Sequence, residues 1–143
     1  MKTNLKRYTN TYLLVGKLEL ILRERILATL SDYSKIKYDA EWFSILPSKE
    51  LKKSAQRELQ FGFYREVLSQ KYFTELWVPV THLIFLNLPN ANTLNSCQMI
   101  DNRMHYATGT RNRVCHFTFD NNHNVEHEEA NLKWLIKALG DKT

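Results

Sequence analysis

Three side chains near the carboxyl end of the chain could together hold a phosphate and move a proton. The stretch TGTRNRVCHFTF, residues 108–119, contains Arg111, Asn112 and His116. A guanidinium is always charged and can donate two parallel hydrogen bonds to phosphate oxygens. Imidazole exchanges protons near neutral pH, and an amide can orient either group although it has no acid–base chemistry itself. The set therefore suits chemistry at a phosphate ester.

An Arg followed by His after four to six residues is a weak pattern, and the Asn directly after Arg111 makes the match rarer. On a regular helix, Asn112 lies about 100° and His116 about 140° around the axis from Arg111, so the three share one side. The alternative without chemistry is a helix-capping Arg with a packed or exposed His. On the pattern alone, both interpretations stay open.

The spacing of apolar residues predicts the helices that would position this stretch. The expected helices cover residues 5–30, 49–59, 60–70, 71–85 with a bend or a restart near Pro79, 94 into the stretch at 108–119, and 125–139. Ser48 and Thr93 are expected N-caps, and Gly140 is expected to end the last helix. The segment around Trp42 and Phe43 is expected to be a turn-rich connection. The sequence therefore predicts one all-α domain over residues 1–143, a bundle of about five helices.

Composition and charge agree with one globular domain and with a polyanionic partner. The chain has 143 residues, a formal net charge of +5 and a pI of about 9.2, so its field attracts polyanions such as nucleic acid. Cys97 and Cys115 have no zinc-ribbon or disulfide spacing, which favours free thiols in the reducing cytoplasm. Lys17 and Glu19 interrupt the apolar patch near the start, so no signal peptide is expected. The later apolar stretch LWVPVTHLIFLNLP is interrupted by Thr81, His82 and Asn87 and is too short for a membrane span.

Four blocks of the chain, taken in order, resemble the Abi-like proteins of bacterial abortive infection, which belong to the HEPN superfamily of helical domains. LELILRERI is similar to a first-helix signature of that family, with Glu19, Leu22 and Arg23 at the matching positions, and Trp42-Phe43 to the aromatic pair that follows. ELQFGFYREVL with FTELWVPVTHLIF resembles the central block. RNRVCH resembles the Arg-Asn-Arg motif with a following His, before a last helix that contains Trp134.

This resemblance implies a HEPN-like fold and a metal-independent endoribonuclease, in which the ribose 2′-hydroxyl attacks the adjacent phosphate and no cofactor takes part. Arg111 and His116 would be the catalytic residues and Asn112 would support them. The resemblance also implies a cytoplasmic homodimer with a shared cleft, a role in phage defence or as a toxin, and an antitoxin or a regulatory RNA or protein as partner.

Three other residues are expected near the RNA on the strength of the resemblance. Glu19 and Arg23 would line the cleft, and the competing interpretation is an ion pair between residues four apart on one helix. Arg113, like Arg103, could contact the RNA backbone or lie on the solvated surface. The interpretation for each of these residues stays open at this point.

The chain also departs from the family pattern and carries a second, metal-like spacing. Phe117 and Thr118 stand where many members have a second His and an acidic residue. The alternative function is therefore a non-catalytic module that binds RNA or a protein.

His123 and His127 have the spacing of zinc ligands, but no paired cysteines accompany them. The sequence therefore predicts that no metal is bound.

Overall fold

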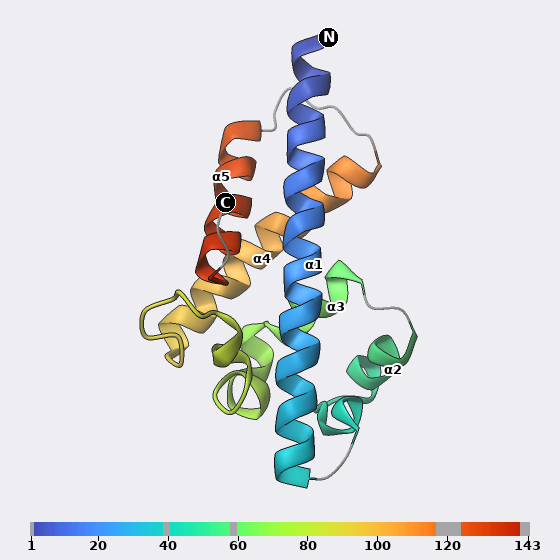
Figure 1. The fold of residues 1–143 in the computed structure, drawn as a ribbon, viewed down its shortest axis with the longest axis vertical. Helices are drawn as coiled ribbons and strands as arrows, with labels where there is room; N and C mark the ends of the chain where they lie inside the picture. The colour runs from blue at the N-terminus through green and yellow to red at the C-terminus, as the bar shows by residue number, and fades with distance from the viewer. Residues whose placement is uncertain (1, 39–40, 58–59, 117–123, 141–143) are drawn as a thin grey trace.

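The structure, a computed structural model, describes residues 2–38, 41–57, 60–116 and 124–140. These residues form five α-helices and four short helical turns, and no strand occurs among them (Figure 1). The α-helices are α1 (Lys2–Tyr38), α2 (Lys49–Arg57), α3 (Phe61–Val67), α4 (Leu94–Cys115) and α5 (Val125–Ala138). The predicted all-α fold class is confirmed.

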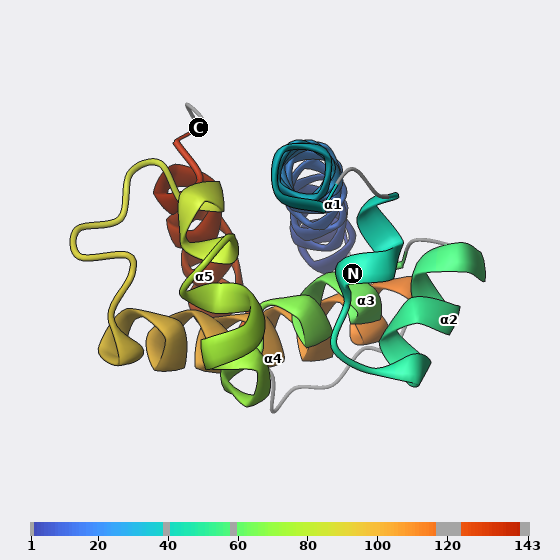
Figure 2. The same ribbon diagram turned by 90° about the horizontal axis from the view of Figure 1, so that it is seen from below.

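The long helix α1 is the axis around which the other elements pack. Helix α5 lies beside its first half and runs in the same direction, while α4 crosses beneath both helices (Figures 1 and 2). Hydrogen bonds between described residues join the parallel pair: the Thr11 hydroxyl donates to Glu129 at 3.2 Å, and Arg25 donates to the carbonyl of Leu139. Helix α4, which crosses beneath this pair, also contacts α1, and its C-terminal end lies against that helix.

One apolar stripe on α1 explains this arrangement. Its fully buried side chains recur every three or four residues: Val15, Leu18, Leu22, Ile26 and Leu30. Each such side chain contributes about 1.5–3 kcal/mol through burial, which outweighs the weak helix propensity of the polar faces. Helix α1 continues to Tyr38, beyond the predicted end at Leu30. Among the described helices, none combines the length and apolar character needed to cross a bilayer.

The helix ends are set by local side-chain hydrogen bonds. Ser48 Oγ accepts from the backbone N–H of Leu51 at 3.0 Å, and Thr93 Oγ1 accepts from that of Ser96 at 3.2 Å, so both predicted caps are confirmed. Asn124 caps α5 in the same way. Gly140 follows α5 with φ +90, a left-handed conformation that glycine adopts without strain, as predicted.

The central aromatic segment is more broken than the sequence predicts. Of the two alternatives for 71–85, the restart near Pro79 is the one observed, but the pieces are short turns and not regular α-helix: η2 (Gln70–Tyr72), a π-helical turn η3 (Phe73–Trp77) and η4 (Thr81–Ile84). Pro79 has no N–H to continue a helix. Trp77 is fully buried and its indole N–H donates to the carbonyl of Ala91 at 2.8 Å, so tertiary packing determines the path here. The aromatic pair after α1 forms a 3-10 turn, η1 (Trp42–Ile45).

Candidate functional site

Arg111 projects from the last turns of α4 toward the interior of the bundle. It follows Ile100, Met104 and Ala107, which are fully buried, at the next helical position. Its Nε is buried and has no hydrogen-bond partner among the described residues, while its Nη1 lies 3.5 Å from Asn112 Oδ1. A buried donor without an acceptor is costly, and a phosphate oxygen is one group that would satisfy it.

His116 is the cap that ends α4. Its backbone has φ −95 and ψ 5, and its N–H donates to the carbonyl of Asn112 at 3.1 Å. The imidazole is exposed. Within the described part of the chain no hydrogen bond joins the side chains of Arg111 and His116. The structure therefore brings Arg111 and Asn112 together, and it leaves His116 at the adjoining surface without contact to the guanidinium.

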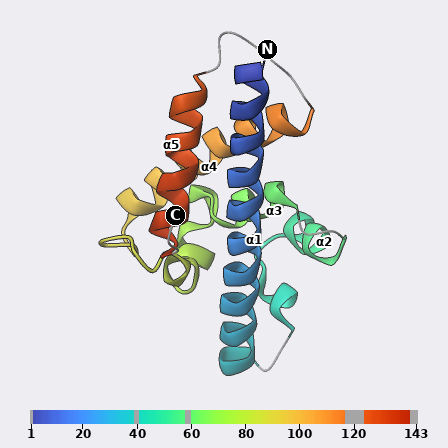
Figure 3. The same cartoon turned by 45° about the horizontal axis from the view of Figure 1, so that its top comes forward.

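Helix α4 reaches this position by packing against α1. In Figures 1 and 3, the end of α4 passes behind the first half of α1, and the two helices are in contact. Gly109 adds no side chain on the outer surface of α4, and a Cβ there would meet no atom within 4 Å. The surface beside Asn112 and His116 is consequently open to a ligand.

Arg113 does not lie where the sequence predicts. It is buried, and its guanidinium makes a two-pronged ion pair with Glu128 of α5, with Nη2–Oε1 at 2.6 Å and Nε–Oε2 at 3.3 Å. The side chains are only 7% and 3% exposed. The expectation of a solvated or RNA-contacting Arg113 is corrected, because this guanidinium is held by a carboxylate inside the α4–α5 interface.

Glu19 and Arg23 lie on α1 near the buried hydroxyl of Tyr64, a residue of α3. Among the described residues they form no ion pair with each other, so the competing ion-pair interpretation is wrong, and their place in an RNA cleft stays a prediction. Burial raises the pKa of the Tyr64 phenol; Arg23 opposes this rise and Glu19 adds to it. The Tyr64 hydroxyl has no hydrogen-bond partner among the described residues. The sequence offered no signal for this tyrosine, which it shows only as one aromatic of the core.

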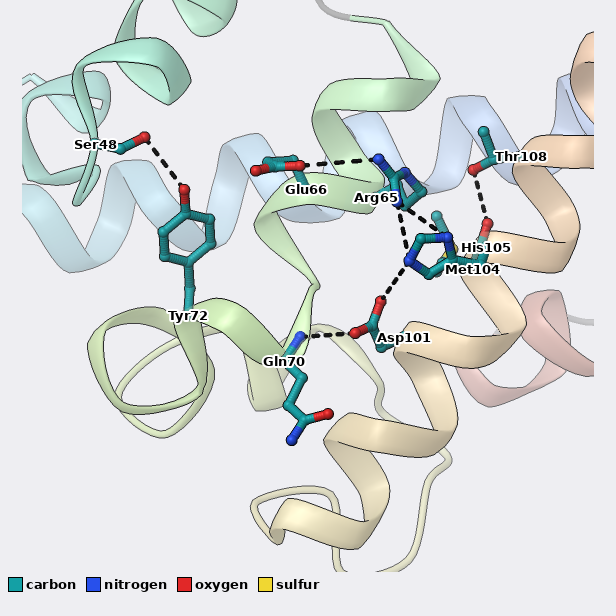
Figure 4. A network of polar contacts seen from close by, with 9 residues as sticks. All are labelled: Ser48, Arg65, Glu66, Gln70, Tyr72, Asp101, Met104, His105 and Thr108. Carbon is teal, nitrogen blue, oxygen red and sulfur yellow. Dashed lines mark hydrogen bonds and ion pairs between the residues drawn. The ribbon is translucent and has the colours of Figure 1, made fainter.

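A second polar cluster was missed at the sequence level, and it joins α3 to α4 (Figure 4). The His105 ring lies between the Asp101 carboxylate, with Nε2–Oδ1 at 3.5 Å, and Arg65, whose Nη1 lies 3.1 Å from Nδ1. The other Asp101 oxygen accepts from the backbone N–H of Gln70 at 3.0 Å. Arg65 also lies 3.9 Å from a Glu66 oxygen.

The roles within this cluster follow from its donors. A guanidinium only donates, and Arg65 Nη1 lies 3.1 Å from Nδ1 and 3.0 Å from Nε2 of His105, so the ring nitrogen without a proton accepts from Arg65. Asp101 Oδ1 is buried and has no hydrogen-bond partner among the described residues, and it lies 3.5 Å from His105 Nε2. The imidazole remains 59% exposed while the Asp101 carboxylate is turned inward at 18%. The group that faces solvent is therefore the Arg65–His105 pair.

The polar side chains of α4 form one continuous surface. At about 100° per residue, Asp101, His105, Asn112 and His116 fall within an arc of about 60°, and His105 lies about 16 Å along the axis from His116. We call these four residues the polar face of α4. Arg111 and Arg65 flank this face, one near each end of it.

The two thiols differ in environment. Cys97 is fully buried, and burial together with the neighbouring Asp101 carboxylate raises its pKa to about 11. It therefore stays protonated near neutral pH and is no nucleophile there. Cys115 is a free and exposed thiol on the last turn of α4.

Several residues named from the sequence lie outside the described part of the chain, namely Phe117, Thr118 and His123. Within the described ranges, no three or more His, Cys, Asp or Glu side chains gather as a metal site would require. His127 is described and lies on the first turn of α5.

No protein-family model matches the chain, and neither a curated protein nor a solved structure is significantly similar to it. The fold defines an all-helical domain. Its α4 carries an arginine whose buried Nε has no hydrogen-bond partner among the described residues, and an exposed histidine five residues later caps the same helix.

Proposed function

We propose that the chain is a metal-independent endoribonuclease of the HEPN type that acts in abortive infection or as a toxin. The observation that carries this proposal is the buried Nε of Arg111, which lacks a partner among the described residues and lies five residues before the exposed His116. The order of the four sequence blocks, which resembles Abi-like proteins, supports the same assignment. An antitoxin or a regulatory RNA or protein would keep such an activity silent.

In this mechanism the ribose 2′-oxygen forms a bond to the adjacent phosphorus while the bond from phosphorus to the 5′-oxygen breaks. The 2′-hydroxyl gives up its proton to a base, and the 5′-oxygen receives a proton from an acid, which leaves a cyclic phosphate and a 5′-hydroxyl. Arg111 would stabilise the charge on the pentacoordinate phosphorus. His116 would transfer one of the two protons.

One histidine cannot transfer both protons at once, so the proposal includes a second subunit with its own His116. An exposed apolar stripe on α1 supports such a dimer. Leu13 and Leu20, seven residues apart on one side of α1, are 62% and 65% exposed. Helix pairs bury residues at this spacing against each other. Because α4 packs on α1, pairing through α1 would bring the two copies of Arg111 and His116 nearer to each other.

The test is incubation of purified protein with cellular RNA in EDTA, alongside size-exclusion chromatography. We expect cleavage that persists in EDTA, products ending in a cyclic phosphate, and elution as a dimer. Cleavage that stops in EDTA contradicts the metal-independent mechanism, and a monomer that cuts RNA contradicts the shared cleft. RNA binding without any cleavage favours the alternative, a non-catalytic RNA-binding module.

The polar face of α4 supplies a path for the RNA strand on either side of the cut. Arg65 presents donors at one end of this face, about 16 Å from His116 along the helix, which is too far to act on the same phosphate. Its position is fixed by His105 at 3.1 Å. The pair would therefore hold a neighbouring phosphate of the strand rather than the one that is cleaved.

Replacing Arg65 with Gln should weaken RNA binding about tenfold, the effect of losing one charge-assisted hydrogen bond. Affinity is measured by fluorescence anisotropy with 2′-O-methyl RNA, which cannot be cut, over a range of salt. The salt slope should fall by about 0.7, the value for one phosphate contact to a single strand.

Lys35→Gln is the matched control, because it removes the same charge from an exposed position near the end of α1. An unchanged affinity and slope in Arg65→Gln, or an equal loss in Lys35→Gln, contradicts the phosphate contact. Cleavage by the wild type is scored separately, so this contact and the ribonuclease proposal can fail independently.

A further inference from the structure

A pocket of about 320 Å³ opens between α4 and α5, away from Arg111. Its lining comes from both helices: Asn102, Arg103, Tyr106, His127 and Asn131. Tyr106 lies about 140° around the α4 axis from Arg111, so a ligand here would not occupy the cleavage site. The volume is at the small end of the range for small-molecule sites, which starts at about 300 Å³.

The most unusual member of this lining is Arg103. Its guanidinium lies 3.9 Å from the centre of the Trp134 ring, and its Nη1 donates to Asn131 Oδ1 at 3.1 Å. The Asn131 amide in turn donates to the carbonyl of Arg103 at 3.0 Å. These contacts hold the guanidinium in one place at the α4–α5 interface.

The charge of Arg103 is left without a counter-ion among the described residues. Arg113, which lies in the same interface, is neutralised by Glu128, whereas no described carboxylate pairs with Arg103. Burial lowers the pKa of Arg103, because removal from water disfavours the charged form. An anion in the pocket would offset this cost, and the face of Trp134 offsets only part of it.

The rest of the lining suits a flat polar ring. Tyr106 is 45% exposed, and the exposed amide of Asn102 offers both a donor and an acceptor. Unpaired bases are commonly stacked on such aromatic side chains and read by such amides. His127 lies in the first turn of α5, where the helix dipole also favours a negative charge.

Acidic groups do not close the pocket to anions. Burial is the main cause that raises the pKa of Tyr106, and the Glu128 carboxylate adds to this rise. That carboxylate is paired with Arg113, whose positive charge lowers the Tyr106 pKa. The Asp101 carboxylate accepts a hydrogen bond from the backbone N–H of Gln70, the first residue of η2 (Figure 4). Among the described residues that line the pocket, Arg103 carries the permanent charge, and this charge is positive.

We propose that this pocket binds a phosphate ester carried beside a flat ring, that is, one nucleotide, with the phosphate against Arg103 and the ring against Tyr106. The chemistry is shared by a free nucleotide and by the phosphorylated end of an RNA strand. This proposal rests on the pocket alone and does not depend on cleavage at His116.

The test is calorimetric titration of the full chain with AMP, ribose 5-phosphate and inorganic phosphate. AMP should bind, and the two ligands without a base should bind at least tenfold more weakly. Tyr106→Ala and Arg103→Gln should each weaken AMP binding about tenfold or more. Tyr12→Ala, which removes an exposed tyrosine from α1 (54% exposed), should leave AMP affinity unchanged.

Failure of AMP to bind, equal binding of inorganic phosphate, or an equal loss in Tyr12→Ala overturns the proposal. Because Arg103 also packs on Trp134, a fold defect in Arg103→Gln is checked by circular dichroism, and Tyr106→Ala then carries the test. Competition between AMP and 5′-phosphorylated 2′-O-methyl RNA assigns the source. Displacement supports a strand end as the ligand, and lack of it supports a free nucleotide.

Discussion

Replacing His116 with Ala should abolish RNA cleavage without unfolding the protein. The imidazole is exposed, and the backbone bond from residue 116 to the carbonyl of Asn112, which ends α4, does not need the side chain. Loss of a group that transfers a proton in the transition state slows a reaction by about 10²–10⁴-fold. The measurement is the rate of RNA cleavage in EDTA, together with far-ultraviolet circular dichroism to verify the fold.

The matched control is Cys115→Ala, which changes an exposed side chain on the same turn and should cut RNA at the wild-type rate. Arg111→Lys separates the two proposed roles, because lysine keeps the charge and loses the paired donors. It should bind 2′-O-methyl RNA with little change and cut RNA poorly. Undiminished cleavage by His116→Ala would remove His116 from the mechanism.

Features that depend on neighbours in sequence were predicted well. Ser48 and Thr93 cap helices because a hydroxyl bonds to a backbone N–H three residues ahead, and Gly140 ends α5 because glycine alone adopts its φ without strain. The stripe on α1 was predictable for the same reason, since helical spacing is a local property.

Features that depend on distant partners were not predicted. The partner of Arg113 is Glu128, fifteen residues later on another helix, and nothing in the motif distinguishes a buried arginine from a solvated one. Arg65 and His105 are forty residues apart and meet only because α3 packs on α4. The break at η3 follows from the packing of Trp77, which helical spacing alone does not reveal.

The candidate site shows the same division. Arg111, Asn112 and His116 were found from their residue types, and the helix that carries them was predicted. The sequence argument placed the three side chains on one side of a helix only if that helix stayed regular through His116. In the structure, α4 ends at Cys115 and His116 is its cap. The structure adds the environment of each side chain: the Arg111 guanidinium is half-buried and its Nε has no partner among the described residues, while the His116 imidazole is exposed.

Replacing Glu128 with Ala should destabilise the fold more than any surface change. The Arg113 guanidinium would stay in the α4–α5 interface, where its side chain is 7% exposed, without the carboxylate that neutralises it. Breaking a buried ion pair by removing one partner costs about 3–5 kcal/mol. At about 2–4 °C per kcal/mol for a domain of this size, the melting temperature should fall by about 10 °C.

Equilibrium urea denaturation followed by circular dichroism measures this loss. Glu24→Ala, which removes an exposed carboxylate from α1, should cost about 1 kcal/mol or less. Replacing both partners, with Arg113→Met and Glu128→Leu together, should recover most of the stability, because no charge is then left buried. A loss of less than about 1 kcal/mol in Glu128→Ala would mean that water reaches Arg113. Apolar packing alone would then hold α4 and α5 together.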